Sequence, residues 1–192
     1  MSTLQCCPQL VVVGASAGGV AALQVLLGAL PASLPVPVLV VLHLPRDRPS
    51  RIVDVLAPYS ALPIREAKDK QPLQPGTVTF APPDYHLLVE DMQAVALSMD
   101  APVLFSRPAI DPLFESAAAA FGDRVLAVLL TGASSDGSEG VAAVRSAGGL
   151  AWLQCPEEAE ASTMPASALQ RAGADAVLPL KLMCRRLKEL FA

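Results

Sequence analysis

The chain has 192 residues, of which 53% are hydrophobic and 17% are charged, and its formal net charge at pH 7 is -4. This length suits one domain with a well-buried core, and the high hydrophobic content excludes an intrinsically disordered chain. Because the chain is acidic and carries no long block of Lys and Arg, we expect no nucleic-acid partner.

Residues 1–8 show no periodicity, and we expect them to be a loose lead-in to a single domain over 1–192. The segment 10–30 is apolar, but glycines interrupt it and no Lys or Arg precedes it. We therefore predict neither membrane insertion nor a signal peptide.

The cysteines and histidines show no metal-binding pattern. They are Cys6, Cys7, Cys155, Cys184, His43 and His86. No C-x-x-C pair occurs among them, and the histidines are too far apart for a local metal motif. We expect reduced thiols, a cytoplasmic location, no metal and no cofactor.

The first part of the chain predicts a strand, a helix and a second strand. A buried strand is expected over 10–13, a helix over 17–30 from its apolar spacing, and a second buried strand over 38–42. Such a βαβ unit places the carboxyl ends of its two parallel strands at one edge of the sheet. Ser16 and His43 follow these strands, so we expect them at the same edge.

The middle of the chain differs in character. Residues 61–110 are rich in proline, with short strands expected over 63–65, 77–80, 86–89 and 94–98. We expect them to form a small antiparallel insertion beside a mostly parallel sheet. A short helix is predicted before it, over 48–56, and another after it, over 111–120 with Asp111 as its N-cap.

The last part of the chain alternates between strands and helices. Strands are predicted over 125–130, 150–154 and 176–178, and helices over 139–146, over 165–171 and from 181 onward. This alternation predicts an α/β fold with a doubly wound, mostly parallel sheet and helices on both faces. Asp136 lies in a loop of small residues that follows the first of these strands.

Ser16, His43 and Asp136 are candidates for a catalytic triad. The segment 14–18 reads G-x-S-x-G, which matches the nucleophile-elbow pattern. A serine hydroxyl becomes a good nucleophile when a histidine takes its proton and an acid fixes the tautomer of that histidine. Each residue also has a structural interpretation, since Ser16 and Asp136 are suited to cap helices and His43 to hydrogen bonding at a strand end.

A series of motifs runs through nearly the whole chain from about Val11. They occupy 13–19, 43–45, 81–86, 106–114, 130–137 and 164–165. In this order they resemble the catalytic domain of the CheB-type chemotaxis protein-glutamate methylesterases. The resemblance implies a doubly wound α/β sheet and hydrolysis of γ-glutamyl methyl esters on chemoreceptor helices, with methanol released and deamidation of glutamines as a related activity.

Carried over position by position, the resemblance makes Ser16 the nucleophile, His43 the general base and Asp136 the third member. It implies that backbone amides near Ala17 and Ala133 hold the oxyanion of the tetrahedral intermediate.

The resemblance assigns further residues to the surroundings of the triad. Gly18, Gly132 and Met164 are expected to line the site. Arg46 and Arg48 follow His43 and belong either to a solvated helix face or to a surface that contacts an acidic receptor helix.

This sequence departs from the family pattern at several positions. Ala17 stands where the family usually has Thr, and the loop 131–137 lacks the usual Met, Gly and Asn. The usual amino-terminal receiver domain is not in the sequence, so a separate receiver-domain protein is a candidate partner.

Other interpretations stay open at this point. The altered loop is compatible with a catalytically weak module that binds a partner in a signalling system. A nucleotide-binding domain is disfavoured because the sequence lacks G-x-G-x-x-G after the first strand. His86 is expected to be structural or to line the site.

Overall fold

The computed structural model describes residues 7–45 and 49–191. Within these ranges the chain forms a seven-stranded sheet in which neighbouring strands are parallel. Its strands are β1 (Leu10–Ala15), β2 (Val38–Leu42), β3 (Ile64–Glu66), β4 (Val78–Phe80), β7 (Val125–Leu129), β8 (Leu150–Gln154) and β9 (Ala176–Leu178). Their order across the sheet is β3-β4-β2-β1-β7-β8-β9.

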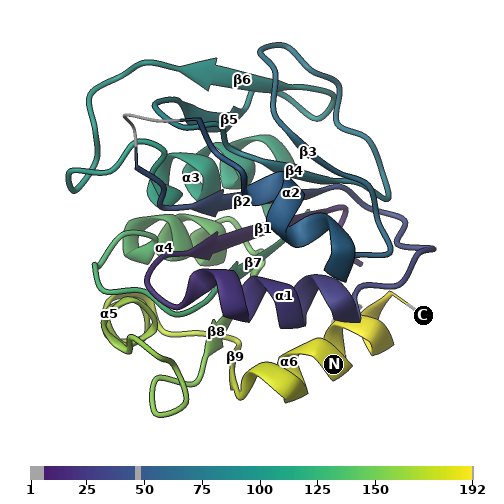
Figure 1. Cartoon of the computed structure of the whole chain (residues 1–192). Helices are drawn as coiled ribbons and strands as arrows, with labels where there is room; N and C mark the ends of the chain where they lie inside the picture. The colour runs from purple at the N-terminus through teal and green to yellow at the C-terminus, as the bar shows by residue number, and fades with distance from the viewer. Residues whose placement is uncertain (1–6, 46–48, 192) are drawn as a thin grey trace.

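Helices cover both faces of this sheet, which confirms the predicted doubly wound α/β class (Figure 1). They are α1 (Gly19–Ala29), α2 (Ile52–Leu56), α3 (Ile110–Phe121), α4 (Ser138–Ser146), α5 (Thr163–Ala172) and α6 (Leu180–Leu190), and short 3-10 turns follow α2 and α3. α1, α2 and α6 pack on one face, and α3, α4 and α5 pack on the other. None of the helices within the described ranges is long and apolar enough to cross a membrane.

The strand β1 is apolar throughout because it is covered on both sides. Val11 and Val13 lie in the core beneath α1 and α6, whereas Leu10 and Val12 lie in the core beneath α3. Successive side chains of a strand point to opposite faces, so a strand between two layers of helices needs apolar residues at every position.

The predicted antiparallel element is present but smaller than expected. β5 (His86–Val89) and β6 (Val95–Ser98) form an antiparallel hairpin. The strands β3 and β4, which we expected in the same insertion, instead extend the parallel sheet beside β2. Three-residue strands show too little alternation to predict their direction, and the complete burial of Val78 and Phe80 marks β4 as a core strand.

Two helices begin at other positions than predicted. α2 starts only after the non-helical residues 49–51. α3 has Ala109 rather than Asp111 at its N-cap position. The carboxylate of Asp111 accepts a hydrogen bond from the amide of Gly140 in α4 at 2.7 Å, so it joins two helices instead of capping its own.

Candidate active site

The candidate site lies where the order of the strands reverses. From β1 the chain proceeds to β2 on one side, and later to β7 on the other side. In open α/β sheets, ligands bind outside the carboxyl ends of the strands at such a switch point. Ser16, His43 and Asp136 follow β1, β2 and β7, so the fold brings three distant segments to this edge.

The pairing of β1 with β2 places Ser16 beside His43. Ala15 is the register partner of Leu42, and the amide of His43 donates to the carbonyl of Ala15 at 3.1 Å. Neighbouring strands are about 4.8 Å apart, so the backbones of Ser16 and His43 are separated by roughly one strand spacing.

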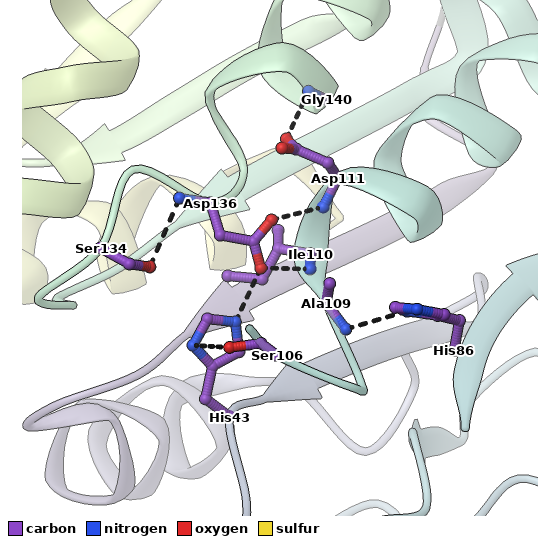
Figure 2. A network of polar contacts seen from close by, with 9 residues as sticks. All are labelled: His43, His86, Ser106, Ala109, Ile110, Asp111, Ser134, Asp136 and Gly140. Atoms are coloured by element: carbon purple, nitrogen blue, oxygen red, sulfur yellow. Dashed lines mark hydrogen bonds and ion pairs between the residues drawn. The ribbon is translucent and has the colours of Figure 1, made fainter. Parts of the chain in front are cut away.

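The imidazole of His43 is hydrogen-bonded to the carboxylate of Asp136 (Figure 2). Nε2 of His43 lies 2.7 Å from Oδ2 of Asp136, whose side chain is 0% exposed. The same carboxylate accepts the amides of Ile110 at 2.7 Å and Asp111 at 3.0 Å. Asp136 therefore receives three hydrogen bonds while its side chain is fully buried.

These hydrogen bonds decide the charge of Asp136. Burial alone would raise the pKa of its carboxyl, but the hydrogen bond from His43 and the two backbone amides outweigh that effect, and the pKa lies below its ordinary value. A carboxylate that stays ionised fixes the proton of His43 on Nε2 and leaves Nδ1 as the basic nitrogen.

The amides reach Asp136 because α3 begins very close to β1. A Cβ at Gly14 would lie 2.6 Å from Cγ2 of Ile110, which is closer than real contacts allow. Only glycine at this position permits the first turn of α3 to approach the strand. Gly14 is therefore needed for the geometry of the acid as well as for the turn after β1.

The second nitrogen of His43 faces a serine that we did not predict. Oγ of Ser106 lies 3.5 Å from Nδ1 of His43, at the long limit of a hydrogen bond (Figure 2). Among the described residues, no hydrogen bond joins the hydroxyl of Ser16 to His43. The structure thus joins His43 to Asp136 and places Ser16 at the end of the adjacent strand, without a hydrogen bond between the side chains of Ser16 and His43.

Ser106 belongs to a motif noted in the sequence, but only the tertiary structure brings it to His43. It follows β6 and precedes Arg107, which anchors the segment. The guanidinium of Arg107 pairs with Asp84 at 2.7 Å and donates to the carbonyls of Met99 and Asp100 at 2.9 and 3.0 Å.

Thr131 is a second residue that sequence reasoning missed. Its carbonyl accepts the amide of Ser16 at 2.9 Å, and its hydroxyl donates to the carbonyl of Ala17 at 2.9 Å. The same hydroxyl accepts the amide of Ala161 at 2.8 Å. Thr131 thereby holds the backbone on both sides of the serine and ties it to the loop 155–162.

The backbone amides near the predicted oxyanion site differ in whether they already donate a hydrogen bond within the protein. Ala17 and Ala133 are exposed, and among the described residues neither amide donates a hydrogen bond. The amide of Gly132 instead donates to the carbonyl of Ala161 at 3.0 Å, so it is not free to bind an oxyanion.

Met164 and Gly18 shape the surroundings of these amides. The fully buried Met164 packs against Gly132, where a Cβ would lie 2.6 Å from its sulfur. Gly18 has a φ of +74° just before α1, and a Cβ there would lie 2.7 Å from the side chain of Glu160. Both residues therefore belong to close contacts between the loops that follow β1, β7 and β8.

Asp111 carries a second buried carboxyl and also supplies one of the two backbone amides that hold Asp136. Burial raises its pKa to about 7, although the hydrogen bond from the amide of Gly140 opposes the effect and the charge of Asp136 adds to it. Its role is to join α3 to α4.

His86 is buried, and both of its ring nitrogens lie within hydrogen-bond distance of the backbone. Its ring is 2% exposed, Nδ1 accepts the amide of Ala109 at 3.2 Å, and Nε2 lies 3.2 Å from the carbonyl of Ala101. It therefore fixes the chain immediately before α3.

The remaining predictions concern two arginines, a metal site and the cysteines. Arg46 and Arg48 lie outside the described residues. Within the described ranges, no group of three or more His, Cys, Asp and Glu could hold a metal ion, and Cys7, Cys155 and Cys184 are free thiols.

The fold and the site define an α/β protein with a hydrogen-bonded His–Asp pair beside a serine at the switch point of its sheet, an arrangement typical of serine hydrolases. Residues 11–187 match the family model described as CheB methylesterase, and the chain belongs to this family.

Individual relatives agree with this assignment. The catalytic domain of a CheB methylesterase from Thermotoga maritima superposes with a TM-score of 0.90 and 32% identity, over 95% of this chain and 98% of that one. A Leptospira interrogans protein named as a candidate protein-glutamate methylesterase/protein-glutamine glutaminase is 38% identical over 94% of this chain and 92% of its own length. A Rhodospirillum rubrum protein-glutamate methylesterase/protein-glutamine glutaminase is 36% identical over 91% of this chain but only 46% of its own length.

Proposed function

We propose that this chain is a serine hydrolase that removes methyl esters from glutamate side chains of chemoreceptors in the cytoplasm and also deamidates certain glutamines. The observation that carries the proposal is the His43–Asp136 pair, at 2.7 Å and with a fully buried carboxylate, beside a serine at the end of the neighbouring strand. The names of the relatives supply the substrate class.

In the proposed mechanism, Ser16 attacks the carbonyl carbon of the ester. Nδ1 of His43 takes the hydroxyl proton, while Nε2–H continues to donate to Asp136. The tetrahedral intermediate collapses, the proton passes from Nδ1 to the leaving methoxide, and methanol departs. Water then attacks the acyl group on Ser16, again with His43 as base, and frees the glutamate carboxyl and the serine.

The negative oxygen of the intermediate needs donors that are already in position. The amides of Ala17 and Ala133 are suited to this role because neither donates a hydrogen bond among the described residues, and the hydroxyl of Thr131 holds the Ala17 carbonyl at 2.9 Å. Correctly aimed donors of this kind contribute about 3 kcal/mol each to the stability of the transition state. Without substrate, the hydroxyl of Ser16 need not be aligned with His43, because catalytic hydrogen bonds often tighten only in the complex.

Methanol release from methylated chemoreceptor membranes tests the proposal. We expect Ser16→Ala to lower kcat by roughly 1,000-fold or more, as removal of a triad nucleophile does. Ser106→Ala is the matched control, because the hydroxyl of Ser106 lies 3.5 Å from Nδ1 of His43 in the structure, and its removal should change kcat by only a few-fold.

The outcomes separate the alternatives. Loss of activity in Ser106→Ala but not in Ser16→Ala would show that the nucleophile is assigned wrongly. No methanol from the unaltered protein would favour the partner-binding module over the esterase.

A further inference from the structure

A tight turn with two bulky apolar residues stands next to the candidate site. The amide of Val103 donates to the carbonyl of Ser106 at 3.1 Å, and the amide of Ser106 donates back to Val103 at 2.8 Å. The two central residues, Leu104 and Phe105, have φ values of +46° and +65°. This is the geometry of a two-residue turn of type I′, which favours Asn and Gly and is unfavourable for bulky side chains.

Both central side chains also project into solvent. Phe105 is 95% exposed and Leu104 is 49% exposed. Both residues have a backbone conformation that is unfavourable for their type, and the apolar surface of their side chains stays in water. No packing within the described chain offsets these two costs. The turn would form more easily with Asn and Gly, so the two apolar side chains do not serve the turn itself. We infer that they serve a contact with another molecule.

The turn is held in a fixed position relative to His43. Ser106 ends it, and the hydroxyl of Ser106 lies 3.5 Å from Nδ1 of His43 (Figure 2). The next residue, Arg107, anchors the segment through its ion pair with Asp84 and its bonds to two carbonyls. Consecutive Cα atoms are about 3.8 Å apart, so Phe105 stands one residue away from a side chain that touches the candidate general base.

We propose that Leu104 and Phe105 form a docking contact for the protein substrate. This inference rests on the proposed function and concerns how the same site selects a protein rather than a small ester. A chain that presents an esterified glutamate to His43 comes close to this turn, because Ser106 at the end of the turn lies 3.5 Å from His43. The partner segment would carry an apolar patch next to the modified residue, into which the ring of Phe105 packs.

The charges around the turn favour a protein surface over a membrane surface as the occupant. The charge of Asp84 is balanced by its ion pair with Arg107, so the carboxylate of Asp100 at the end of β6 leaves an excess negative charge beside the turn, and the chain as a whole carries a formal charge of -4. Anionic lipid headgroups would be repelled, whereas an apolar patch on a protein would not.

The test uses the double substitution Leu104→Asn with Phe105→Gly. This pair is the one that a type I′ turn prefers, so the turn is retained while its apolar tip is removed. Met92→Asn is the matched control, since Met92 is 45% exposed and lies in the turn between β5 and β6. Binding of a methylated chemoreceptor cytoplasmic fragment is measured in the Ser16→Ala background, and methanol release is measured with Ser16 intact.

We expect the double substitution to raise both the Kd and the KM for the receptor fragment about tenfold or more, with a much smaller change in kcat. The loss should be at least tenfold larger on the receptor than on a small ester such as p-nitrophenyl acetate, and Met92→Asn should have no effect. An unchanged Kd and KM, or no binding by the Ser16→Ala protein, would overturn the docking proposal. So would a change of oligomeric state in the double variant, because the tip would then be covered by a second copy.

The two proposals fail separately. If the unaltered protein releases methanol and the double variant keeps its KM, the esterase stands and the docking contact falls. If no methanol is released but the double substitution weakens receptor binding tenfold, the docking contact stands and the esterase falls.

Discussion

Asp136 shows how a single residue combines the stability of the fold with the chemistry of the site. Its carboxylate is completely buried and accepts hydrogen bonds from His43, Ile110 and Asp111. The two amides belong to the first turn of α3, so the acid is held by a helix terminus that also favours its negative charge. Any change to this side chain should therefore affect both the activity and the free energy of unfolding.

Asp136→Asn is expected to lower kcat about 10⁴-fold, as removal of the orienting carboxylate does in a triad, because His43 loses its preferred tautomer. One amide of α3 would also face an NH₂ group, which should cost about 1–3 kcal/mol of unfolding free energy. Methanol release and urea denaturation measure the two effects. Full activity in this variant would contradict the role given to Asp136.

The titration of Asp111 should make the free energy of unfolding depend on pH. Its pKa is raised from 3.8 to about 7 in the folded protein, so the folded state favours the protonated form. The stabilisation from this group is fully present below pH 3.8 and is lost as the pH rises through about 7. Asp136 acts in the opposite sense, since its lowered pKa costs stability only at acidic pH.

We therefore expect Asp111→Asn to remove a decline in stability that the unaltered protein shows between about pH 4 and pH 7. The variant keeps an oxygen that can accept the amide of Gly140. Urea midpoints at pH 4.5 and pH 7.5 check this, with the difference between the two pH values as the readout. Parallel pH curves for the two proteins would show that Asp111 does not titrate as described.

At the scale of elements, Thr131 connects the end of β7 to the loop before α1 and to the loop 155–162. Its hydroxyl contacts Ala17 and Ala161, and its carbonyl holds the amide of Ser16. The prediction of strands and helices from sequence places most elements within a few residues, but it did not reveal this connection. Hydrogen bonds between loops depend on tertiary geometry, and a threonine after a strand has no pattern that signals them.

Thr131→Val keeps the shape of the side chain and removes its hydroxyl. We expect kcat to fall about 10- to 100-fold, because the carbonyl of Ala17 loses its hydrogen bond and the turn that carries the Ala17 amide is held less firmly. Unfolding free energy should fall by about 1–2 kcal/mol, since the amide of Ala161 is left without its partner. Thr131→Ser should restore most of the kcat. An unchanged kcat in the valine variant would exclude a positioning role.

At the scale of the whole molecule, one sheet is shared by two cores. The cluster that contains α1 and α6 and the cluster that contains α3, α4 and α5 lie on opposite faces of the same strands. Neither layer of helices can lose its packing without exposing one face of the sheet. The chain is therefore expected to unfold as one domain.

This expectation has a direct test. The only tryptophan, Trp152, is 8% exposed in β8, while the far-ultraviolet circular dichroism reports all helices. We expect both signals to change at the same urea concentration in one cooperative transition. Separate midpoints would show that the two layers unfold independently.

The sequence by itself determined the fold class, the buried strands β1, β2, β7 and β8, and the strand-end positions of Ser16, His43 and Asp136. These features follow from local periodicity and from the rule that parallel strands end at one edge. The tertiary structure alone decided that β3 and β4 join the main sheet and that Ser106 lies beside His43. It also decided that the amides of α3 hold Asp136. Such contacts join residues far apart in the chain, and only the packing of α3 against Gly14 and of the loops against β1 brings them together.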